Sequence, residues 1–388
     1  MGVRLRLVLA ATLLTLAAAR AHADCASPVG RDFTASSLAD ARLDPASLAT
    51  ANVELDDAGM EIRALLVIRD CKLAFERYKA GLGREHIHVI HSVTKSVTTT
   101  LAGNLLMGGA IPSLDAPIAS LVAKPGAATT EMWTNAQRIT LRNALGMASG
   151  LEYKHNPGGG LAVYRTETDR LLEAIKPPLV APPGTKFNYS DGDASLYGAA
   201  IASAGKTDLL TLARTILFTP MGFGRHEWNY RDREGRYPGG WSMRLRAMDM
   251  AKLGQLYLQQ GRWDGKQIVT DAFKQTVWTA GPSRQYGLGW WIATDPELAG
   301  TPLYVANGWK GQRVFVYPSL NMVVAVIASL PGAEERTMAN GLARHMARAA
   351  KRGYVADPGA EQRLAAAAAR GFQGTLRVDQ QAQDIPSR

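Results

Sequence analysis

The segment from His91 to Ile118 reads HSVTKSVTTTLAGNLLMGGAIPSLDAPI, and it contains both a helix and a candidate nucleophile. Residues 92–107 are rich in Thr, Val and Leu, and Gly108-Gly109 follows at once, so we predict a helix over 92–107. Ser92 and Lys95 are three residues apart and share one face of this helix, with Cβ atoms about 5–6 Å apart. The segment therefore places a hydroxyl and an amine side by side at a helix N-terminus.

This serine and lysine have the chemistry of an activated nucleophile. A serine hydroxyl attacks poorly until a neighbouring group takes its proton. A buried lysine loses charge through desolvation and is then able to act as that base, while the free N–H groups of the helix end favour negative charge. The spacing alone is not specific, because S-x-x-K recurs at Ser203–Lys206, where it ends a helix and is not expected to be a site. Without further context, Ser92 would be interpreted as a helix cap and Lys95 as a solvated side chain.

Strand-like sequences lie on both sides of this helix, near the two ends of the chain. Residues 61–78 (EIRALLVIRDCKLAFERY) predict a hairpin that turns at Arg69-Asp70. Four apolar runs follow late in the chain, at 287–292, 303–306, 313–317 and 322–328, and a turn at 318–321 joins the last two. The sequence between them is mostly helical, with helices expected from Thr140 to Gly150, over 194–204 and over 245–261. We therefore predict an α/β (α+β sandwich) fold, in which an antiparallel sheet from the N- and C-terminal segments is flanked by helices and carries an inserted helical lobe at roughly 110–285.

The first 23 residues have the features of a signal peptide. A basic start precedes an apolar run at 7–19, which is too short to span a membrane comfortably, and Ala21-His22-Ala23 is a small-x-small cleavage site. We expect an exported protein, periplasmic or secreted, that begins at Asp24; the alternative is an uncleaved anchor. The remaining chain divides into a hydrolase domain at 24–356 and a peripheral Ala/Gln-rich tail at 357–388.

The composition is that of a globular protein. The 388 residues are 46% hydrophobic and 20% charged, and loss of Arg4, Arg6 and Arg20 with the leader would lower the net charge from +10 to +7. The basic residues are scattered, except for a helix-like cluster, interpreted as a solvated face, at Arg344, Arg348, Lys351 and Arg352. No nucleic-acid-binding motif is present, so nucleic acid is not expected as a partner.

The chain contains only two cysteines, Cys25 and Cys71. In an oxidising compartment the pair predicts a disulfide, and two unpaired thiols are the alternative. The absence of a CxxC motif argues against a redox site or a cysteine zinc site.

Two further motifs carry groups that suit acyl transfer. Tyr189 in FNYSDG is able to shuttle a proton beside a Ser/Lys pair, although a partly buried loop tyrosine is the simpler interpretation. The stretch ANGWKGQ (306–312) places glycines at the start of a strand, where a backbone N–H is able to face an oxyanion. A strand-start bulge is the alternative for this stretch.

In combination these motifs resemble the class C β-lactamase and penicillin-binding protein family, in the branch with esterases and 6-aminohexanoate-dimer hydrolases. The resemblance covers roughly residues 60–330 and includes HSVTKSVTTTLAGNLLMGGAIPSLDAPI, ITLRNALGMASGLEY, FNYSDGDASLYGAAI, GGWSMRLRAMDMAKLGQLYLQQGRWDGKQIV and YGLGWW. It implies a two-step acyl-enzyme route without metal or cofactor: Ser92 is acylated, Lys95 is its base and Tyr189 the general acid/base. The N–H groups of Ser92 and Trp309 would form the oxyanion hole.

The sequence departs from the family pattern at two places that bear on the substrate. Asp191 stands where the family usually has asparagine, and a carboxylate there favours a charged Lys95 or a cationic substrate. Ala306-Asn307-Gly308 replaces the usual Lys-Thr-Gly or His-Thr-Gly, although Lys310 lies nearby. With Asp191, Gly308, Lys310 and Gly311 as candidate substrate-binding residues, we expect a small ester or linear amide as substrate. A β-lactam is the second expected substrate, and a D-alanyl-D-alanine peptide is the third.

Other classes of function are possible from the sequence. His86, His88 and His91 form an H-x-H-x-x-H run that is close to metallo-hydrolase spacing, but Ile90 stands where that family has an aspartate. A catalytically silent binding module with the same fold is a second alternative. A lipase-type hydrolase is disfavoured because G-x-S-x-G does not occur. Trp241, Trp290, Trp291 and Trp309 are expected in the core, with one or two of them lining an apolar acyl pocket.

Overall fold

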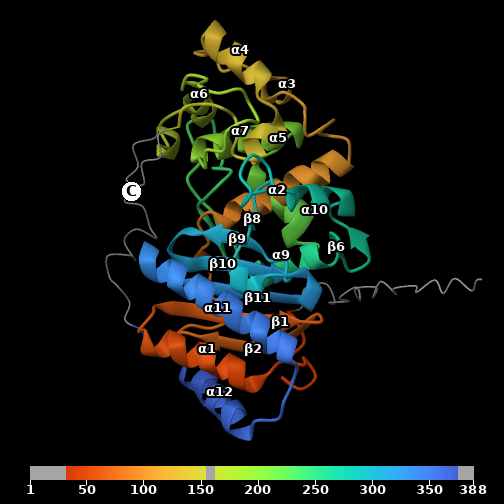
Figure 1. Cartoon of the computed structure of the whole chain (residues 1–388). Coiled ribbons are helices and arrows are strands. Elements are labelled where there is room, and N and C mark those ends of the chain that lie inside the picture. Colours follow the sequence, from red (N-terminus) through yellow and green to blue (C-terminus); the bar gives the residue numbers. More distant parts are fainter. Residues whose placement is uncertain (1–31, 154–161, 375–388) are drawn as a thin grey trace, which may run out of the picture.

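A computed structural model describes residues 32–153 and 162–374 (Figure 1). The predicted signal peptide, Cys25 and the last part of the tail lie outside the described residues. None of the helices within the described ranges is long and apolar enough to cross a membrane.

Within these ranges one antiparallel sheet joins the two ends of the chain, as predicted. Its order is β2-β1-β11-β10-β9-β8. The strands are β1 (Ile62–Arg69), β2 (Lys72–Tyr78), β8 (Trp291–Ile292), β9 (Tyr304–Gly308), β10 (Gln312–Tyr317) and β11 (Met322–Ala328). The N-terminal strand β1 pairs directly with the C-terminal strand β11, with Leu65 opposite Val326.

Both predicted hairpins are present, and the backbone angles of their turn residues are those that hairpins require. Asp70 and Cys71 have positive φ angles of 49° and 65°, the backbone twist that tight hairpin turns require. Asn321 has φ 46° after the short 3-10 turn Pro318–Leu320, which connects β10 to β11.

Helices cover the sheet on both faces (Figure 1). Val324 and Val326 of β11 pack in the core beneath α1 (Pro45–Asp57) and α11 (Gly332–Arg352), whereas Val323 and Ala325 belong to the core with α2 (Val93–Met107) and α9 (Ala247–Leu258). Strands buried on both faces are continuously apolar rather than alternating, which explains the unbroken run at 322–328. Helix α12 (Pro358–Arg370) packs against α1 and β2.

The segment between α2 and β8, apart from α9, forms the helical lobe, most of which lies in the upper half of Figure 1. Its helices are α3 (Ile118–Leu121), α4 (Thr130–Arg138), α5 (Leu141–Leu145), α6 (Arg170–Ile175), α7 (Asp191–Ala204), α8 (Leu209–Ala213) with the π-helical Arg214–Phe218, and α10 (Asp271–Val277). Short strands accompany them: β3 (His88–Val89), β4 (Glu227–Trp228), β5 (Met243–Leu245), β6 (Arg262–Trp263) and β7 (Lys266–Gln267). Strand β3, which leads into α2, pairs with β5.

Three predicted elements differ from the observed ones. Helix α7 begins at Asp191 rather than Ala194, because the Ser190 hydroxyl caps it by accepting the Asp193 N–H at 3.0 Å. Helix α5 ends at Leu145, well before Gly150. The run 287–292 is a strand only at Trp291–Ile292, because Gly289 has φ 70° and its carbonyl accepts the Ser96 hydroxyl of α2 at 2.7 Å.

Candidate active site

Ser92 lies at the N-terminus of α2, where strand β3 leads into the helix. It occupies the N-cap position, but its side chain does not cap the helix. Its Oγ instead accepts a hydrogen bond from Lys95 Nζ at 3.1 Å. The interpretation of Ser92 as a helix cap is therefore wrong, and its hydroxyl is directed at the lysine one turn along.

Lys95 is almost fully buried, with a relative exposure of 1%. Its Nζ donates to three acceptors: Ser92 Oγ, Asp191 Oδ1 at 2.6 Å and the Gly240 carbonyl at 3.0 Å. Burial by itself lowers the pKa of Lys95, but the Asp191 carboxylate and the Tyr189 phenol oppose it, and the pKa lies above its usual value. Lys95 is therefore a charged ammonium whose three N–H bonds are all used. Desolvation alone would discharge it, but Asp191 and Tyr189 together outweigh burial, so the pKa of Lys95 is raised rather than lowered.

Asp191 is held from two sides in the first turn of α7. One oxygen receives the Lys95 ammonium, and the other accepts the Tyr164 hydroxyl at 2.5 Å. Burial and the adjoining Asp191 carboxylate raise the pKa of Tyr164, so this phenol stays protonated as a donor. The departure from the family's asparagine thus produces a buried ion pair behind the nucleophile.

Two of these partners were not predicted from the sequence. Tyr164 lies in a short 3-10 turn (Ala162–Tyr164) that has no recognisable motif. Gly240 lies so close to Lys95 that a Cβ atom there would be 2.8 Å from Nζ and from Asp191 Oδ1. Only glycine permits this approach, and the Gly239-Gly240 pair before Trp241 was the available signal.

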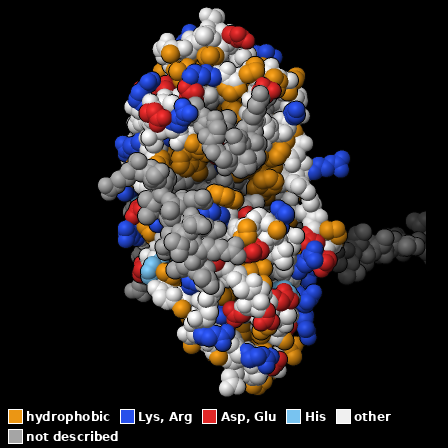
Figure 2. Space-filling model, turned by 90° about the vertical axis from the view of Figure 1, so that its left-hand side faces the viewer, with side chains coloured by type: hydrophobic (Ala, Val, Ile, Leu, Met, Phe, Trp, Pro, Cys, Tyr) orange, Lys and Arg blue, Asp and Glu red, His pale blue; other side chains and the backbone are white. Residues whose placement is uncertain are grey.

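Tyr189 lies immediately before α7 and faces the same ammonium. Lys95 Nζ is 4.9 Å from the centroid of its ring. The ring also packs at 5.5 Å on Trp291 and at 5.8 Å on Tyr286, and Phe187 contacts both of these. These four side chains (Phe187, Tyr189, Tyr286 and Trp291) form an aromatic wall that reaches Lys95 through Tyr189. Tyr286 is buried within it, and the other three are partly exposed. Figure 2 shows hydrophobic side chains across the middle of this face, between the lobe and the sheet half.

On the opposite side of Ser92, the end of β9 lies against the segment that leads into α2. A Cβ on Gly308 would be 2.4 Å from the Ile90 carbonyl, so only glycine allows the strand this close. The Trp309 ring contacts His91 at 5.5 Å between centroids and is 54% exposed. Among the described residues, no acceptor receives the backbone N–H of Ser92 or of Trp309. Trp309 directly follows the glycine that abuts the segment ahead of Ser92.

The other candidate substrate-binding residues lie elsewhere. Lys310 is buried, with its Nζ over the Trp309 ring and its backbone N–H donated to Glu335 of α11 at 3.1 Å. Gly311 packs toward Ala328 and Met338, on the α11 side of the sheet. Neither residue offers an exposed group beside Ser92, so their predicted contact with substrate is not supported.

The three histidines of the alternative metal-binding motif have different surroundings. His86 accepts the Gly83 N–H, whereas His88 is buried in β3 and His91 packs on Trp309. Across 32–153 and 162–374, no group of three or more His, Cys, Asp or Glu side chains is arranged to hold a metal ion.

The structure also describes the second S-x-x-K motif and one cysteine of the predicted disulfide. Ser203 and Lys206 are exposed at the end of α7. Cys71 is disulfide-bonded, and its predicted partner Cys25 lies outside the described residues.

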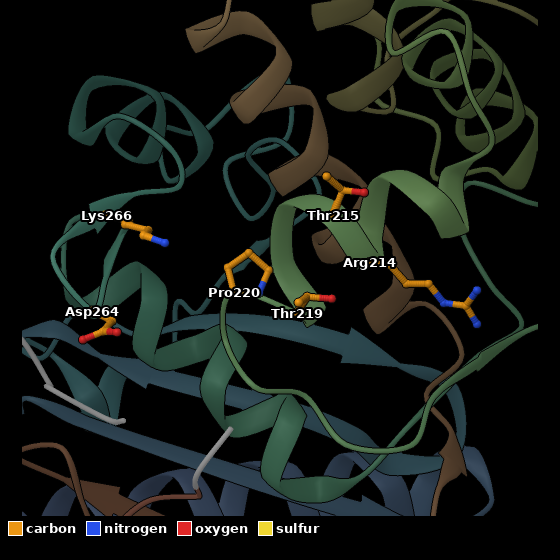
Figure 3. A pocket seen from close by; sticks show the side chains of 6 residues that line it. All are labelled: Arg214, Thr215, Thr219, Pro220, Asp264 and Lys266. Carbon is orange, nitrogen blue, oxygen red and sulfur yellow. The ribbon is translucent and has the colours of Figure 1, made fainter. Parts of the chain in front are cut away.

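A surface pocket of about 460 Å³ lies apart from this site (Figure 3). Its lining comes from the π-helical turn after α8 and from the β6–β7 hairpin: Arg214, Thr215, Thr219, Pro220, Asp264 and Lys266. The Arg214 side chain extends away from Lys266 and donates to His226 at 3.1 Å. None of the candidate catalytic residues lines this pocket.

The family profile described as Beta-lactamase matches residues 54–369, which is most of the chain. The chain belongs to the Beta-lactamase family. It is 21% identical over 334 residues to the 6-aminohexanoate-dimer hydrolase of Paenarthrobacter ureafaciens, covering 76% of this chain and 82% of that protein. As a member of this family, the protein is a serine hydrolase.

Solved structures support the same fold. EstCE1, a hydrolase with promiscuous acyltransferase activity, superposes with a TM-score of 0.61 at 16% identity, covering 78% of this chain and 99% of that one. A penicillin-binding protein from Bacillus halodurans gives a TM-score of 0.59 at 17% identity, covering 76% and 98%. At such identities the likeness concerns the fold, which is the predicted β-lactamase/transpeptidase-like architecture.

Proposed function

We propose that this serine hydrolase cleaves a small ester or linear amide through an acyl-enzyme formed on Ser92. The observation that carries the proposal is the 3.1 Å hydrogen bond between Lys95 Nζ and a Ser92 hydroxyl that does not cap its helix. A serine bonded to a buried ammonium is placed in a strong local field, as nucleophilic catalysis requires. Lys95, which bonds this hydroxyl, also lies 4.9 Å from the Tyr189 ring, and no acceptor among the described residues takes the backbone N–H of Ser92 or of Trp309.

In the proposed acylation, Tyr189 rather than Lys95 receives the serine proton. The ammonium of Lys95 already carries three N–H bonds and donates all of them, so it has no lone pair for a proton. In this route Tyr189 acts as a phenolate, so its own phenol proton leaves to solvent before the serine reacts, and the charge of Lys95, 4.9 Å from the ring, would favour that anion. Ser92 Oγ then attacks the substrate carbonyl carbon while its proton passes to the Tyr189 oxygen.

The tetrahedral oxyanion forms beside the N–H groups of Ser92 and Trp309, which hold its charge without a metal or cofactor. When it collapses, the bond to the leaving group breaks and Tyr189 returns the proton to the departing alcohol or amine. Deacylation repeats the steps with water: Tyr189 takes a proton from the water, whose oxygen attacks the ester carbonyl. The proton then returns to Ser92 Oγ and the acid is released.

Charge at the site favours an uncharged substrate. Ala306 replaces the cation that the family usually carries on this strand, and the Lys310 ammonium is buried. Asp191 balances the charge of Lys95 and would repel a carboxylate. The aromatic wall suits an apolar acyl group. The name of one relative, 6-aminohexanoate-dimer hydrolase, supports a linear amide as substrate.

Comparative turnover tests this assignment. Purified mature protein should hydrolyse p-nitrophenyl butyrate with a kcat/KM at least tenfold above that for penicillin G, and Ser92→Ala should abolish both. Faster turnover of penicillin G would favour a β-lactamase. A stable penicillin adduct would favour a D-alanyl-D-alanine carboxypeptidase. No activity in the wild type would favour the silent binding module, and full activity in Ser92→Ala would exclude Ser92 as the nucleophile.

We also propose that the protein is exported to the periplasm or secreted after cleavage behind Ala23. The disulfide at Cys71 supports this, because structural disulfides form in oxidising compartments. Intact mass should show a mature chain that begins at Asp24 and is two hydrogens lighter than its reduced form. A full-length chain with reactive thiols in the cytoplasmic fraction would contradict the proposal.

A further inference from the structure

Arg313 is a buried cation that lies behind the candidate oxyanion donor without entering the site. It is on β10 with a relative exposure of 5%. Phe315 and Tyr317, which share its face of the strand, pack in the core beneath α11. Ser92 lies at the start of α2, whose core residues pack on the opposite face of the sheet. Arg313 therefore cannot contact a substrate bound at Ser92.

The guanidinium is held in a fork of strong hydrogen bonds. Nη1 donates to the Gly308 carbonyl at 2.6 Å, and Nη2 donates to Glu335 Oε1 at 2.6 Å. The second oxygen of Glu335 accepts the Lys310 N–H at 3.1 Å. One carboxylate of α11 thus anchors both the guanidinium and the turn that contains Trp309. Charge-assisted bonds of this kind are about twice as strong as neutral ones.

The carbonyl that Arg313 binds belongs to the same peptide group as the Trp309 N–H. Peptide groups are planar, and the described residues contain no cis peptide bond, so this C=O and N–H point in opposite directions. Anchoring the Gly308 carbonyl on Arg313 therefore directs the Trp309 N–H away from the guanidinium. Gly308 itself abuts the Ile90 carbonyl, in the segment that leads to Ser92. A cation on the carbonyl also polarises the amide, which makes its N–H a stronger donor.

We infer that Arg313, held by Glu335, is a positioning residue that orients and polarises the Trp309 N–H for the oxyanion of the reaction. This inference rests on the proposed function, because it assigns a support to one of the two proposed oxyanion donors. Its consequence is specific: loss of the guanidinium should weaken stabilisation of the tetrahedral species more than binding of the substrate.

The test uses the double variant Arg313→Met/Glu335→Gln in the full mature chain. It removes the guanidinium and the charge together, so no buried charge is left unpaired, while the amide oxygen of the introduced glutamine remains as an acceptor for the Lys310 N–H. The matched control is Arg77→Met/Asp56→Asn. Arg77 is equally buried and bonds both a carboxylate (Asp56 at 2.8 Å) and a backbone carbonyl (Gly371 at 3.0 Å), on β2 at the far edge of the sheet.

For p-nitrophenyl butyrate, kcat of the double variant Arg313→Met/Glu335→Gln should fall by roughly 10- to 100-fold, with KM changed less than about twofold. This is less than the fall of about 10²–10³ in kcat that follows the loss of a whole oxyanion donor. Affinity for phenylboronic acid, which forms a tetrahedral adduct on serine, should fall in parallel with kcat/KM. The control variant should keep kcat and phenylboronic acid affinity even where its melting temperature drops. If the double variant does not fold, Arg313→Lys takes its place, with a smaller loss in both quantities and KM again unchanged.

A folded Arg313 variant with the kcat and phenylboronic acid affinity of the wild type would overturn the inference alone. A rise in KM with unchanged kcat would also overturn it, because that pattern reports lost binding rather than lost transition-state stabilisation. A wild-type chain that is neither labelled at Ser92 nor inhibited by phenylboronic acid would instead overturn the proposed function, and the inference with it.

Discussion

The two sides of the candidate active site are built in different ways. On the Lys95 side, three segments far apart in the chain converge: α2, the start of α7 and the Gly239-Gly240 turn. On the Trp309 side, one hairpin and one helix suffice, with Arg313 and Glu335 holding the turn after β9. The first side controls a proton and a charge, and the second presents a neutral N–H. The charge state of Lys95 therefore depends on partners far away in the chain, whereas the direction of the Trp309 N–H depends on the orientation of one peptide group.

The largest loss is expected where the Lys95 side transfers a proton. Tyr189→Phe removes the phenol oxygen and keeps the ring against Trp291, so kcat should fall by roughly 10²–10⁴ with little change in melting temperature. Stopped-flow and steady-state turnover of p-nitrophenyl butyrate measure it. Tyr286→Phe, on a ring of the same wall that does not contact Lys95 in the structure, is the matched control. Activity close to that of the wild type in Tyr189→Phe would make Tyr189 a packing residue.

The next effect separates charge from hydrogen bonding on the same side. Asp191→Asn keeps one oxygen as an acceptor for Lys95, and its NH2 group faces the Tyr164 hydroxyl, which would then have to accept rather than donate. The substitution removes the carboxylate that opposes burial, so the pKa of Lys95 should fall. Lys95 then loses its charge at a lower pH, and the alkaline limb of kcat/KM should shift to lower pH. The stability that Lys95 contributes is present below its unfolded pKa and is lost as pH rises through the raised folded pKa, so the variant should also be less stable at neutral pH.

A pH–rate profile of Asp191→Asn measures this shift. Asp115→Asn, which breaks an exposed ion pair with Arg142, is the control and should leave the profile where it is. An alkaline limb that does not move in Asp191→Asn would show that Lys95 owes its charge to other groups.

A smaller effect is expected on the Trp309 side, because its contribution comes from the backbone. Trp309→Ala removes an indole that is 54% exposed and keeps the N–H, so kcat should change by less than about threefold. Lost apolar contact with the substrate should appear in KM instead. Steady-state kinetics with butyrate and acetate esters distinguish the two, since the KM effect should be larger for the longer acyl chain. A large fall in kcat would mean that the indole itself is needed in the transition state.

The smallest effect on activity is expected at Asp193, two residues beyond Asp191. Comparing the two residues distinguishes the effect of burial on a carboxyl group from the effect of an ion pair. Burial raises its pKa to about 8, against small opposing contributions from hydrogen bonds with Ser149. The folded state therefore holds a proton at neutral pH that the unfolded state releases, so stability falls as pH rises from about 4 to 8, by at most roughly 1.4 kcal/mol per pH unit.

Asp193→Asn should remove this dependence without changing kcat. Urea unfolding at pH 5 and pH 8 should show a larger fall in the free energy of unfolding for the wild type than for the variant. Equal pH dependence in the two proteins would contradict the assignment of a buried neutral carboxyl group.

Local patterns in the sequence were sufficient for much of the fold, whereas the candidate nucleophile also needed the resemblance to the family, because S-x-x-K occurs twice. The hairpin at 62–78, the strand pair 312–328 and helix α2 are each encoded by neighbouring residues, and the spacing of Ser92 and Lys95 on one helix face needs no tertiary information. Helix α7 was predicted three residues late because the Ser190 cap precedes its apolar residues.

The partners of Lys95 and of Trp309 could not be found in this way. Gly240 is 145 residues from Lys95 in the chain, and Tyr164 meets Asp191 from a turn without regular periodicity. The sequence already indicated that Asp191 favours a charged Lys95, but the relative weight of burial and of this ion pair could not be judged from it. Lys310 seemed close to the site by sequence, yet its backbone is tied to Glu335 on α11.

The most direct test is intact-protein mass spectrometry of the mature chain after treatment with a fluorophosphonate, followed by peptide mapping. The account predicts a single adduct on Ser92, lost in Ser92→Ala and much slowed in Tyr189→Phe. No adduct, or an adduct on another serine such as Ser203, would contradict it.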